Sequence, residues 1–450
     1  MTPSTDERRR AEWLGWIAWA IAALFYGYGF FQRVAPGVLV SDLMRDLALD
    51  GTRIGTLSAA YFYAYAAVQI PTGLLLDRFG ARRLLACASL LAAAGGFVFA
   101  AAGGLGSAIV GRAAIGAGVG VAYVGCLAIA ATSLPPERFG LVAGLTLTVG
   151  TAGALSAQIP LAVLVDLLDW RATMAGVAAL GVLMALAAFF GIRDAGFDRQ
   201  GNRARASMTA SLAAILGRSE TWWLAGVTAF LGAPVLTFAG LWGVPYFRQV
   251  AGLAREQAGL FTSLLLVAWA VGGPLMGAVS DRVGRRPVLI ACALLMAASW
   301  LPFLLAAPPP MPLATAAMLV MGVAGGAMVV AYAAARDRFA EEGAATAMGI
   351  VNSSVLLAGA LLQTFVGWFL DLGWRGQLAE GARVYPAAAW RGAWVLLFCS
   401  PIAAAVCAWL LPRRAECGMA LRTVAAVPGG SRDPDGNARP GPASPCQRGR

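Results

Sequence analysis

The segment GLLLDRFGARR at residues 73–83 returns later in the chain as GAVSDRVGRRP at residues 277–287. Both copies contain the pattern G-x3-D-R-x-G-x-R in the same register, with one further arginine beside it, and Asp77 and Asp281 lie 204 residues apart. Each copy follows an apolar stretch long enough to cross a membrane. A pattern that recurs at the same place in two series of apolar segments indicates a duplicated chain with two related halves.

The chemistry of the repeated loop predicts a conformational gate. Gly73 and Gly277 are expected to let two helices approach closely, whereas Gly80 and Gly284 suit a tight turn with positive φ. The aspartate can accept hydrogen bonds at a helix end and pair with arginine. The predicted gate comprises Gly73, Asp77, Arg78, Gly80, Arg82, Arg83 and Arg138 in the first half, and Gly277, Asp281, Arg282, Gly284, Arg285, Arg286 and Arg338 in the second.

A second, weaker repeat contains Arg138 and Arg338, the two gate residues that lie in other loops. Arg138 lies in PPERFG and Arg338 in RDRFAEEG, after the fourth and the tenth apolar segments. Each half therefore has an acidic loop and a basic loop, and we expect Asp77 to pair with the loop of Arg138 and Asp281 with the loop of Arg338. The competing interpretation is that these arginines only anchor the loops at the membrane surface.

The composition excludes an ordinary soluble protein. Hydrophobic residues make up 59% of the 450 residues and charged residues only 13%, about half the share of a soluble chain. The net charge of +11 comes from arginine alone and collects in alternate loops and the two tails, which is typical of membrane topology signals and not of a nucleic-acid surface. The sequence contains no histidine, and the seven cysteines show no metal-ligand spacing. We expect no enzyme activity, no metal and no cofactor.

Twelve membrane spans are predicted, which makes the expected fold class an all-α membrane protein with two pseudo-symmetric six-helix bundles. The expected spans are 13–40, 54–76, 84–102, 108–132, 141–165, 172–192, 221–247, 257–279, 287–307, 313–335, 345–370 and 391–411. The expected segments are a tail at 1–12, bundles at 13–192 and 219–411, a linker at 193–218, and a disordered tail at 412–450. Arg8, Arg9 and Arg10 precede the first span, so we expect both termini in the cytoplasm of a bacterium, with the chain in its inner membrane.

The doubled loop resembles the hallmark cytoplasmic loop of the major facilitator superfamily, and the resemblance covers about residues 13–411. It implies two bundles around a central cavity, with alternating access by rocking and a chain that acts as a monomer in the lipid bilayer. The fourth span, with Arg112 and three glycines, also looks like the equivalent span of that family. The runs FFQRVAPGVLVSDLMRDLALD and AAYFYAYAAVQIPTGLLLDRFG are similar to the bacterial phagosomal nutrient transporters and the lysosomal dipeptide carriers.

Polar side chains within the spans are the candidates for contact with a solute. Arg33 and Arg112 could grip a carboxylate or phosphate, because an ionised group in hydrocarbon is costly and is retained for function. Snorkelling to the membrane surface is the alternative for both. Tyr61, Tyr65 and Gln69 share one helix face. The predicted binding residues are Tyr26, Arg33, Tyr61, Tyr65, Gln69, Arg112, Tyr123, Gln158, Trp269, Asn352 and Gln363.

Carboxylates are missing from the middle of every predicted span. Asp42 and Asp46 are expected in the first external loop, and Asp166 and Glu220 at span ends. The sequence therefore predicts a carrier of a small anionic or zwitterionic solute, such as an amino acid, a short peptide or an organic acid, working as a uniporter or coupled through the charge of the solute. A drug or cation exporter of the same fold is the alternative, and the fifth span lacks the G-P-x-x-G-G run of drug antiporters.

Overall fold

The computed structural model describes residues 5–135, 138–193, 213–339 and 343–412. Residues Met1–Leu410 form one compact unit, and Leu411–Arg450 are a second unit. Most of the predicted linker and nearly all of the predicted C-terminal tail lie outside the described residues, so the five segment boundaries stay predictions.

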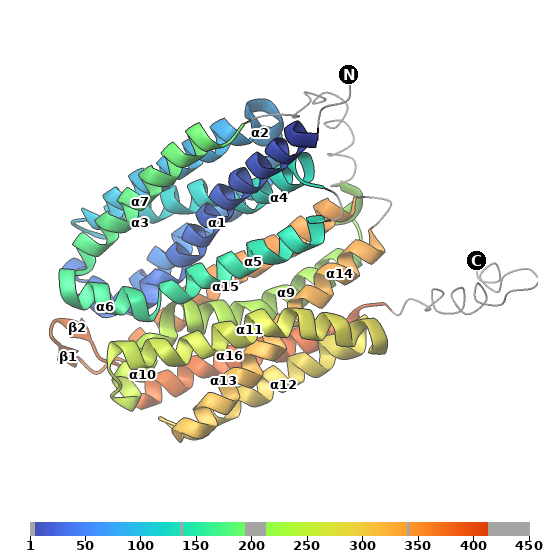
Figure 1. The fold of residues 1–450 in the computed structure, drawn as a ribbon. Helices are drawn as coiled ribbons and strands as arrows, with labels where there is room; N and C mark the ends of the chain where they lie inside the picture. The colour runs from blue at the N-terminus through green and yellow to red at the C-terminus, as the bar shows by residue number, and fades with distance from the viewer. Residues whose placement is uncertain (1–4, 136–137, 194–212, 340–342, 413–450) are drawn as a thin grey trace, which may run out of the picture. The chain divides into compact units, whose positions relative to one another are not determined.

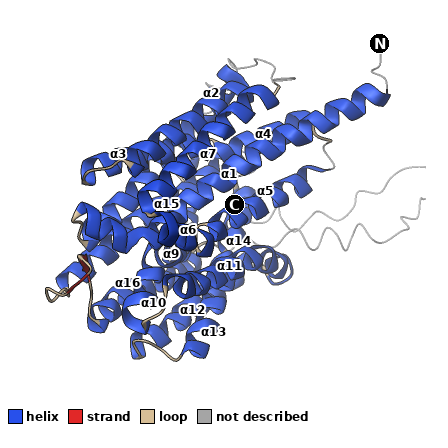
Figure 2. Cartoon of the chain, turned by 60° about the vertical axis from the view of Figure 1, so that its left-hand side comes forward, coloured by secondary structure: helices blue, strands red, loops and turns tan. Residues whose placement is uncertain are grey.

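Almost all regular structure in the described chain is α-helical (Figure 2). The first half contains α1 (Thr5–Leu47), α2 (Gly51–Ala100), α3 (Leu105–Val119), α4 (Ala122–Ser133), α5 (Phe139–Ser156), α6 (Ile159–Leu168) and α7 (Trp170–Gly191). The second half contains α9 (Ser219–Thr237), η2 (Phe238–Trp242), α10 (Gly243–Ala251), α11 (Arg255–Val283), α12 (Arg285–Leu305), α13 (Met311–Gly326), α14 (Met328–Arg338), α15 (Ala344–Leu372) and α16 (Ala387–Leu410).

The helices of the first unit run side by side at a common slant (Figure 1). In that view α2, α3 and α7 form one flank, α12 and α13 form the other, and α5, α9 and α15 lie between them. Eleven segments of the described chain are long and apolar enough to cross a membrane. The part of α2 before Gly80 is a further long helix and completes the twelve predicted spans.

Two glycines of the repeated loops adopt the backbone conformation that the sequence predicts. Gly80 has φ 76° and breaks α2, and Gly284 has φ 97° and separates α11 from α12. A residue with a side chain rarely adopts such angles, so glycine is required at both turns. The expected close approach at Gly73 and Gly277 is absent from this conformation, because a Cβ atom built on either residue would have no neighbour within 4 Å.

Small residues instead bring helices together within each half. A Cβ on Gly116 of α3 would lie 2.2 Å from the main-chain oxygen of Tyr61 in α2, so these two helices cross closely at a glycine. In the second half, a Cβ on Gly326 of α13 would lie 2.4 Å from the carbonyl carbon of Gly272 in α11. The same pair of helices is therefore in backbone contact in both halves.

Two features of the structure were not predicted. α1 continues to Leu47, so Asp42 and Asp46 lie on a helix and not in an external loop. The strands β1 (Leu378–Ala379) and β2 (Ala382–Arg383) form a short antiparallel hairpin between α15 and α16. Its two turn residues, Glu380 and Gly381, both have positive φ, as the tightest hairpins require.

Candidate functional site

A narrow cavity lies between the two halves. It has a volume of about 20 Å³, room for about one water molecule in this conformation, and is lined from the first half by α1 and α5, and from the second half by α9, η2 and α11. Of the predicted binding residues, Arg33 and Trp269 line it. Apart from Arg33, Trp269 and Thr151, the lining is made of Phe30, Val34, Ala154, Val235, Leu236, Gly240 and Leu266.

Arg33 is the charged residue of this lining. Only 6% of it is exposed, and no carboxylate of the described residues forms an ion pair with it. Its Cζ atom lies 4.3 Å from the ring centre of Phe30 and 5.2 Å from that of Tyr65. The aromatic faces attract the guanidinium without neutralising it, so the cavity keeps a net positive group.

Three of the predicted binding residues, Tyr26, Tyr65 and Tyr123, form an aromatic group beside Arg33. The ring centres of Tyr26 and Tyr123 lie 5.3 Å apart, and Tyr26 also contacts Phe30 at 4.9 Å. The hydroxyl of Tyr332 in α14 donates to Oδ1 of the predicted residue Asn352 in α15 at 3.1 Å. Tyr332 is a binding candidate that the sequence analysis did not predict.

Arg112 does not line the cavity. It is fully buried beside the ring of Tyr61, with 4.9 Å from Cζ to the ring centre, and Nη1 donates to the main-chain oxygen of Gln32 at 2.7 Å. Tyr61 is also fully buried, and its hydroxyl donates to the main-chain oxygen of Gly29 at 2.8 Å. Both side chains hold the backbone of α1, so the prediction that they face the solute differs from what the structure shows.

The predicted glutamines also lie elsewhere. Gln158 and Gln363 are buried and bond to main-chain oxygens of the second half, Gln158 to Ala239 at 3.2 Å and Gln363 to Leu236 at 3.0 Å. Gln69 is half-buried, and within the described residues no hydrogen bond is assigned to it. Helical spacing placed these residues on polar faces but could not tell a cavity from a helix crossing.

The two halves meet at one end of the helices, which we call the sealed end and define by Asp42, Asp166 and Asp371. At its centre, a Cβ on Gly37 of α1 would lie 3.1 Å from the main-chain oxygen of Gly240 in η2. Since the repeat offset is 204 residues, these two glycines occupy nearly equivalent positions in the halves. The first helix of each half therefore crosses its counterpart through glycine.

Two equivalent contacts flank this crossing, and we call them the first and second clasps. In the first clasp, Gln158 between α5 and α6 lies against Gly259 of α11 and accepts a hydrogen bond from Thr262 at 2.8 Å. In the second clasp, the main chain of Gln363 in α15 lies against Gly55 of α2, with 2.6 Å from a built Cβ to the Gln363 oxygen. Each clasp joins one half to the other.

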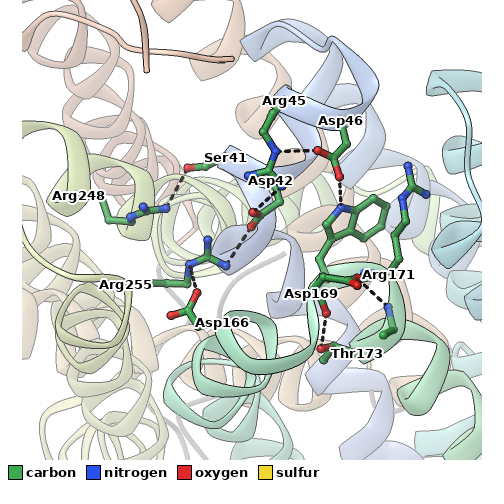
Figure 3. A network of polar contacts seen from close by, with 12 residues as sticks. Ser41, Asp42, Arg45, Asp46, Asp166, Asp169, Arg171, Thr173, Arg248 and Arg255 are labelled. Carbon is green, nitrogen blue, oxygen red and sulfur yellow. Dashed lines mark hydrogen bonds and ion pairs between the residues drawn. The ribbon is translucent and has the colours of Figure 1, made fainter. Parts of the chain in front are cut away.

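The first clasp ends in a network of ion pairs (Figure 3). Arg255 at the start of α11 lies 2.9 Å from Asp42 of α1 and 3.5 Å from Asp166 of α6. The Asp42 and Arg255 side chains are only 7% and 11% exposed, so this pair is largely shielded from water. Arg45 adds a second cation 3.3 Å from Asp42, and Arg248 donates to the hydroxyl of Ser41 at 3.1 Å.

The second clasp ends in a helix cap. Asp371 at the end of α15 accepts hydrogen bonds from the main-chain N–H of Gly51 at 2.9 Å and of Thr52 at 2.7 Å, and from the Thr52 hydroxyl at 2.7 Å. Arg383 and the Tyr385 hydroxyl donate to the same carboxylate, and burial together with this charge raises the pKa of Tyr385. One side chain of the second half thus caps the start of α2 in the first half.

The opposite end, which we call the repeat end, carries the predicted gate at residues 73–83 and 277–287. Every ion pair resolved there between described residues stays within one half. Asp281 pairs with Arg285 of its own loop at 2.6 Å, Arg285 also lies 3.5 Å from Asp337 in the loop of Arg338, and Arg138 pairs with Glu12 at 2.6 Å. Arg338 pairs with Glu220 in the same way as Arg138 with Glu12.

The remaining gate residues lie at the surface of the repeat end. Arg78, Arg83 and Arg282 are exposed, and Arg82 lies over the ring of Phe189 in α7 at 4.4 Å. Arg286 donates to the main-chain oxygen of Trp409. The side chain of Asp77 lies outside the described residues.

A second internal repeat, which the sequence reading missed, could have located the clasps. QIPLAVLVD at residues 158–166 and QTFVGWFLD at residues 363–371 share the pattern Q-x7-D and lie 205 residues apart. Their partners Gly259 and Gly55 lie 204 residues apart. The offset matches that of the repeated loop, but only two letters are shared, and such a signal stands out only when the helix contacts are known.

A membrane-embedded body of two six-helix halves around a cavity is the architecture of a secondary carrier fold. A family profile described as Major Facilitator Superfamily matches residues 17–268 and 242–424. The chain belongs to this superfamily. The narrower resemblance to phagosomal and lysosomal carriers stays a prediction.

Solved structures with the same fold include a bacterial homologue of the human lysosomal transporter Spinster in an inward-facing, unoccupied conformation. It has a TM-score of 0.74 and 16% identity and covers 91% of this chain and 98% of its own. A D-xylose–proton symporter has a TM-score of 0.69 with 18% identity, over 88% of this chain and 98% of its own.

Among curated relatives, the "Probable sulfoacetate transporter SauU" of Cupriavidus necator is 26% identical over 59% of this chain, and the match spans 65% of that relative's length. The "Probable galactarate/D-glucarate transporter GudP" of Escherichia coli is 31% identical over 18% of this chain and 17% of its own.

Proposed function

We propose that this protein is a secondary transporter that carries a small organic anion through the membrane by alternating access. The observation that supports this most is Arg33, a buried cation that lines the cavity between the halves without a carboxylate partner among the described residues. A buried charge is costly unless it is compensated. An anionic solute supplies the compensation each time it binds.

The composition of the lining favours an anion over a zwitterion or a cation. None of the ten lining residues is acidic, so an ammonium group would have no counter-ion there. Phe30 and Trp269 offer aromatic faces, and Thr151 offers a hydroxyl. We therefore expect a solute whose carboxylate or sulfonate binds Arg33, as the names of the sulfoacetate and glucarate relatives also suggest. A drug or cation exporter lacks support from this cavity.

The conformation fits one step of an alternating-access cycle. The two clasps and the glycine crossing close the sealed end, while the ion pairs resolved between described residues at the repeat end each stay within one half. The arginine-rich repeat end belongs in the cytoplasm by the positive-inside rule, which makes the sealed end periplasmic and this state inward-facing. The clasps must open for the solute to reach Arg33 from the other side.

The structure places the carboxylate of Asp42 on α1, 2.9 Å from Arg255 of the second half. Sequence reasoning favoured uniport because carboxylates were expected only in loops and at span ends, but Asp42 lies on α1 within a helix crossing, 5% exposed. Uptake measured with and without an imposed pH gradient, using a permanently charged sulfonate, separates coupled transport from uniport.

The test of the function is uptake of radiolabelled sulfoacetate and D-glucarate into proteoliposomes. Arg33→Gln should lower uptake of a transported anion by at least about tenfold, because a charge-assisted hydrogen bond is lost. Arg391→Gln, which removes an exposed arginine of α16, is the charge-matched control and should leave uptake unchanged. Undiminished uptake by Arg33→Gln would refute the proposed site, and thermal-shift screening of carboxylates and sulfonates would reveal which anions bind.

A further inference from the structure

Arg112 forms a hydrogen bond with the peptide group that joins Gln32 to Arg33. Its Nη1 atom donates to the main-chain oxygen of Gln32 at 2.7 Å, and that carbonyl belongs to the peptide whose nitrogen is that of Arg33. Arg112 is fully buried and is not part of the cavity lining, whereas Arg33 is. The sequence analysis placed both arginines in one anion site. In the structure Arg33 lines the cavity, and Arg112 contacts the backbone that carries Arg33.

The carbonyl of Gln32 has a reason to need an outside donor. In an α-helix, the oxygen of residue 32 accepts from the N–H of residue 36. Residue 36 is Pro36, which lies inside α1 and has no N–H to donate. Gln32 is 0% exposed, so water does not reach this carbonyl either. Arg112 supplies, from α3, the hydrogen bond that the proline withholds.

We propose that Arg112 is a positioning residue, which replaces the hydrogen bond missing at Pro36 and so fixes the Gln32–Arg33 peptide and the direction in which Arg33 leaves α1. The role of Arg33 in this inference rests on the proposed function, but the hydrogen-bond replacement does not. Arg112 acts on the anion only through Arg33.

The second half contains a neutral version of the same arrangement. Pro234 lies inside α9, and the oxygen of Phe230, four residues earlier, accepts a hydrogen bond from the hydroxyl of Ser400 in α16 at 2.8 Å. A carbonyl freed by proline is thus served by a side chain from a neighbouring helix in both halves. Because Phe230 and Ser400 are not part of the cavity lining, this pair is the matched control.

The experiment is a double-mutant cycle on the full chain in detergent and in proteoliposomes. Pro36→Ala returns an N–H to position 36, so it should make Arg112 dispensable. Arg112→Met should lower the thermal unfolding midpoint and weaken sulfoacetate binding by about tenfold in the native background, but by less than about threefold when combined with P36A. The Pro234→Ala and Ser400→Ala cycle should show the same coupling in unfolding and no change in sulfoacetate binding.

The outcomes separate the possible roles. Equal losses from R112M with and without P36A in the unfolding measurement would overturn the hydrogen-bond replacement. Recovery of stability without recovery of sulfoacetate binding would mean that Arg112 contacts the anion, which overturns the positioning role. If R112M alone fails to fold, restoration of monodisperse protein by P36A supports the replacement, and its failure overturns it. If the native protein binds no sulfoacetate or D-glucarate, the proposed function fails while the unfolding cycle still decides the replacement.

Discussion

The two clasps of the sealed end occupy equivalent places in the two halves but use different forces. The first ends in Asp166, which is 50% exposed and lies 3.5 Å from Arg255. The second ends in Asp371, which is 16% exposed and accepts five hydrogen bonds, three of them from the start of α2. Duplication supplied the same aspartate twice, and the surroundings made one a weak ionic contact and the other a helix cap.

The largest difference should appear when the two equivalent aspartates are neutralised. Asp371→Asn leaves buried N–H groups short of an acceptor and should destabilise the sealed conformation by about 3 kcal/mol, whereas Asp166→Asn should change it by less than about 1 kcal/mol. The measurement is the distance between nitroxide labels on R78C and R282C at the repeat end, in a variant without the native cysteines. Equal shifts for both variants would abolish the contrast between the clasps.

The shielded ion pair of Asp42 and Arg255 should come next. Asp42→Asn leaves Arg255 with only the distant Asp166, and breaking a buried pair typically costs about 3 kcal/mol, reduced here by the remaining contact. The same label pair should report a shift towards the conformation with a closed repeat end. This shift should depend little on salt concentration, because the ion pair is buried and dissolved ions do not reach it. A shift that disappears in 1 M salt would place the pair at an exposed surface.

The two clasps also differ in how closely the helices pack at their glycines. A Cβ on Gly55 would lie 2.6 Å from the backbone of α15, but a Cβ on Gly259 would have its nearest neighbour at 3.5 Å. Gly55→Ala should therefore destabilise the sealed conformation by about 2 kcal/mol, and Gly259→Ala should be tolerated. Unfolding midpoints and label distances measure both. If G259A were the more damaging variant, the assignment of a tight and a loose clasp would be reversed.

The smallest effect concerns one hydroxyl in each clasp. Thr262 donates to Oε1 of Gln158 at 2.8 Å, while the equivalent atoms of the second clasp, the Ser58 hydroxyl and Oε1 of Gln363, are buried without a partner. Thr262→Val should cost about 1 kcal/mol in unfolding free energy, and Ser58→Ala should be neutral or slightly stabilising. A loss of stability in S58A equal to that of T262V would show that Ser58 also forms a hydrogen bond.

The fold follows from the sequence because its signals are local or repeated. Apolar runs and the duplicated loop predict twelve helices in two halves, and Gly80 and Gly284 adopt the predicted turn. The family profile confirms the superfamily. The ion pairs of the gate were less predictable, because a repeated Asp–Arg loop shows which charged groups are present but not which of them pair with each other. Arg138 pairs with Glu12 and Arg338 with Glu220, and in both pairs the two residues are far apart in the sequence.

The candidate site was predictable only in part, for a physical reason. A buried arginine looks the same in sequence whether it faces a cavity or a freed carbonyl, so Arg33 and Arg112 were read alike. Pro36, four residues after Gln32, is the signal that separates them, and it acquires meaning only when Arg112 is known to pack on α1. The clasps were missed because Gln158 and Gln363 were assigned to the solute.

The cap that Asp371 places on α2 links two parts of the chain that are synthesised far apart in time. Gly51 and Thr52 leave the ribosome 320 and 319 residues before the carboxylate that accepts their N–H groups. Until then, the first half has an unfinished helix start at its outer edge. A first half expressed by itself should consequently insert into the membrane but keep this edge open to proteases until the second half is supplied as a separate chain.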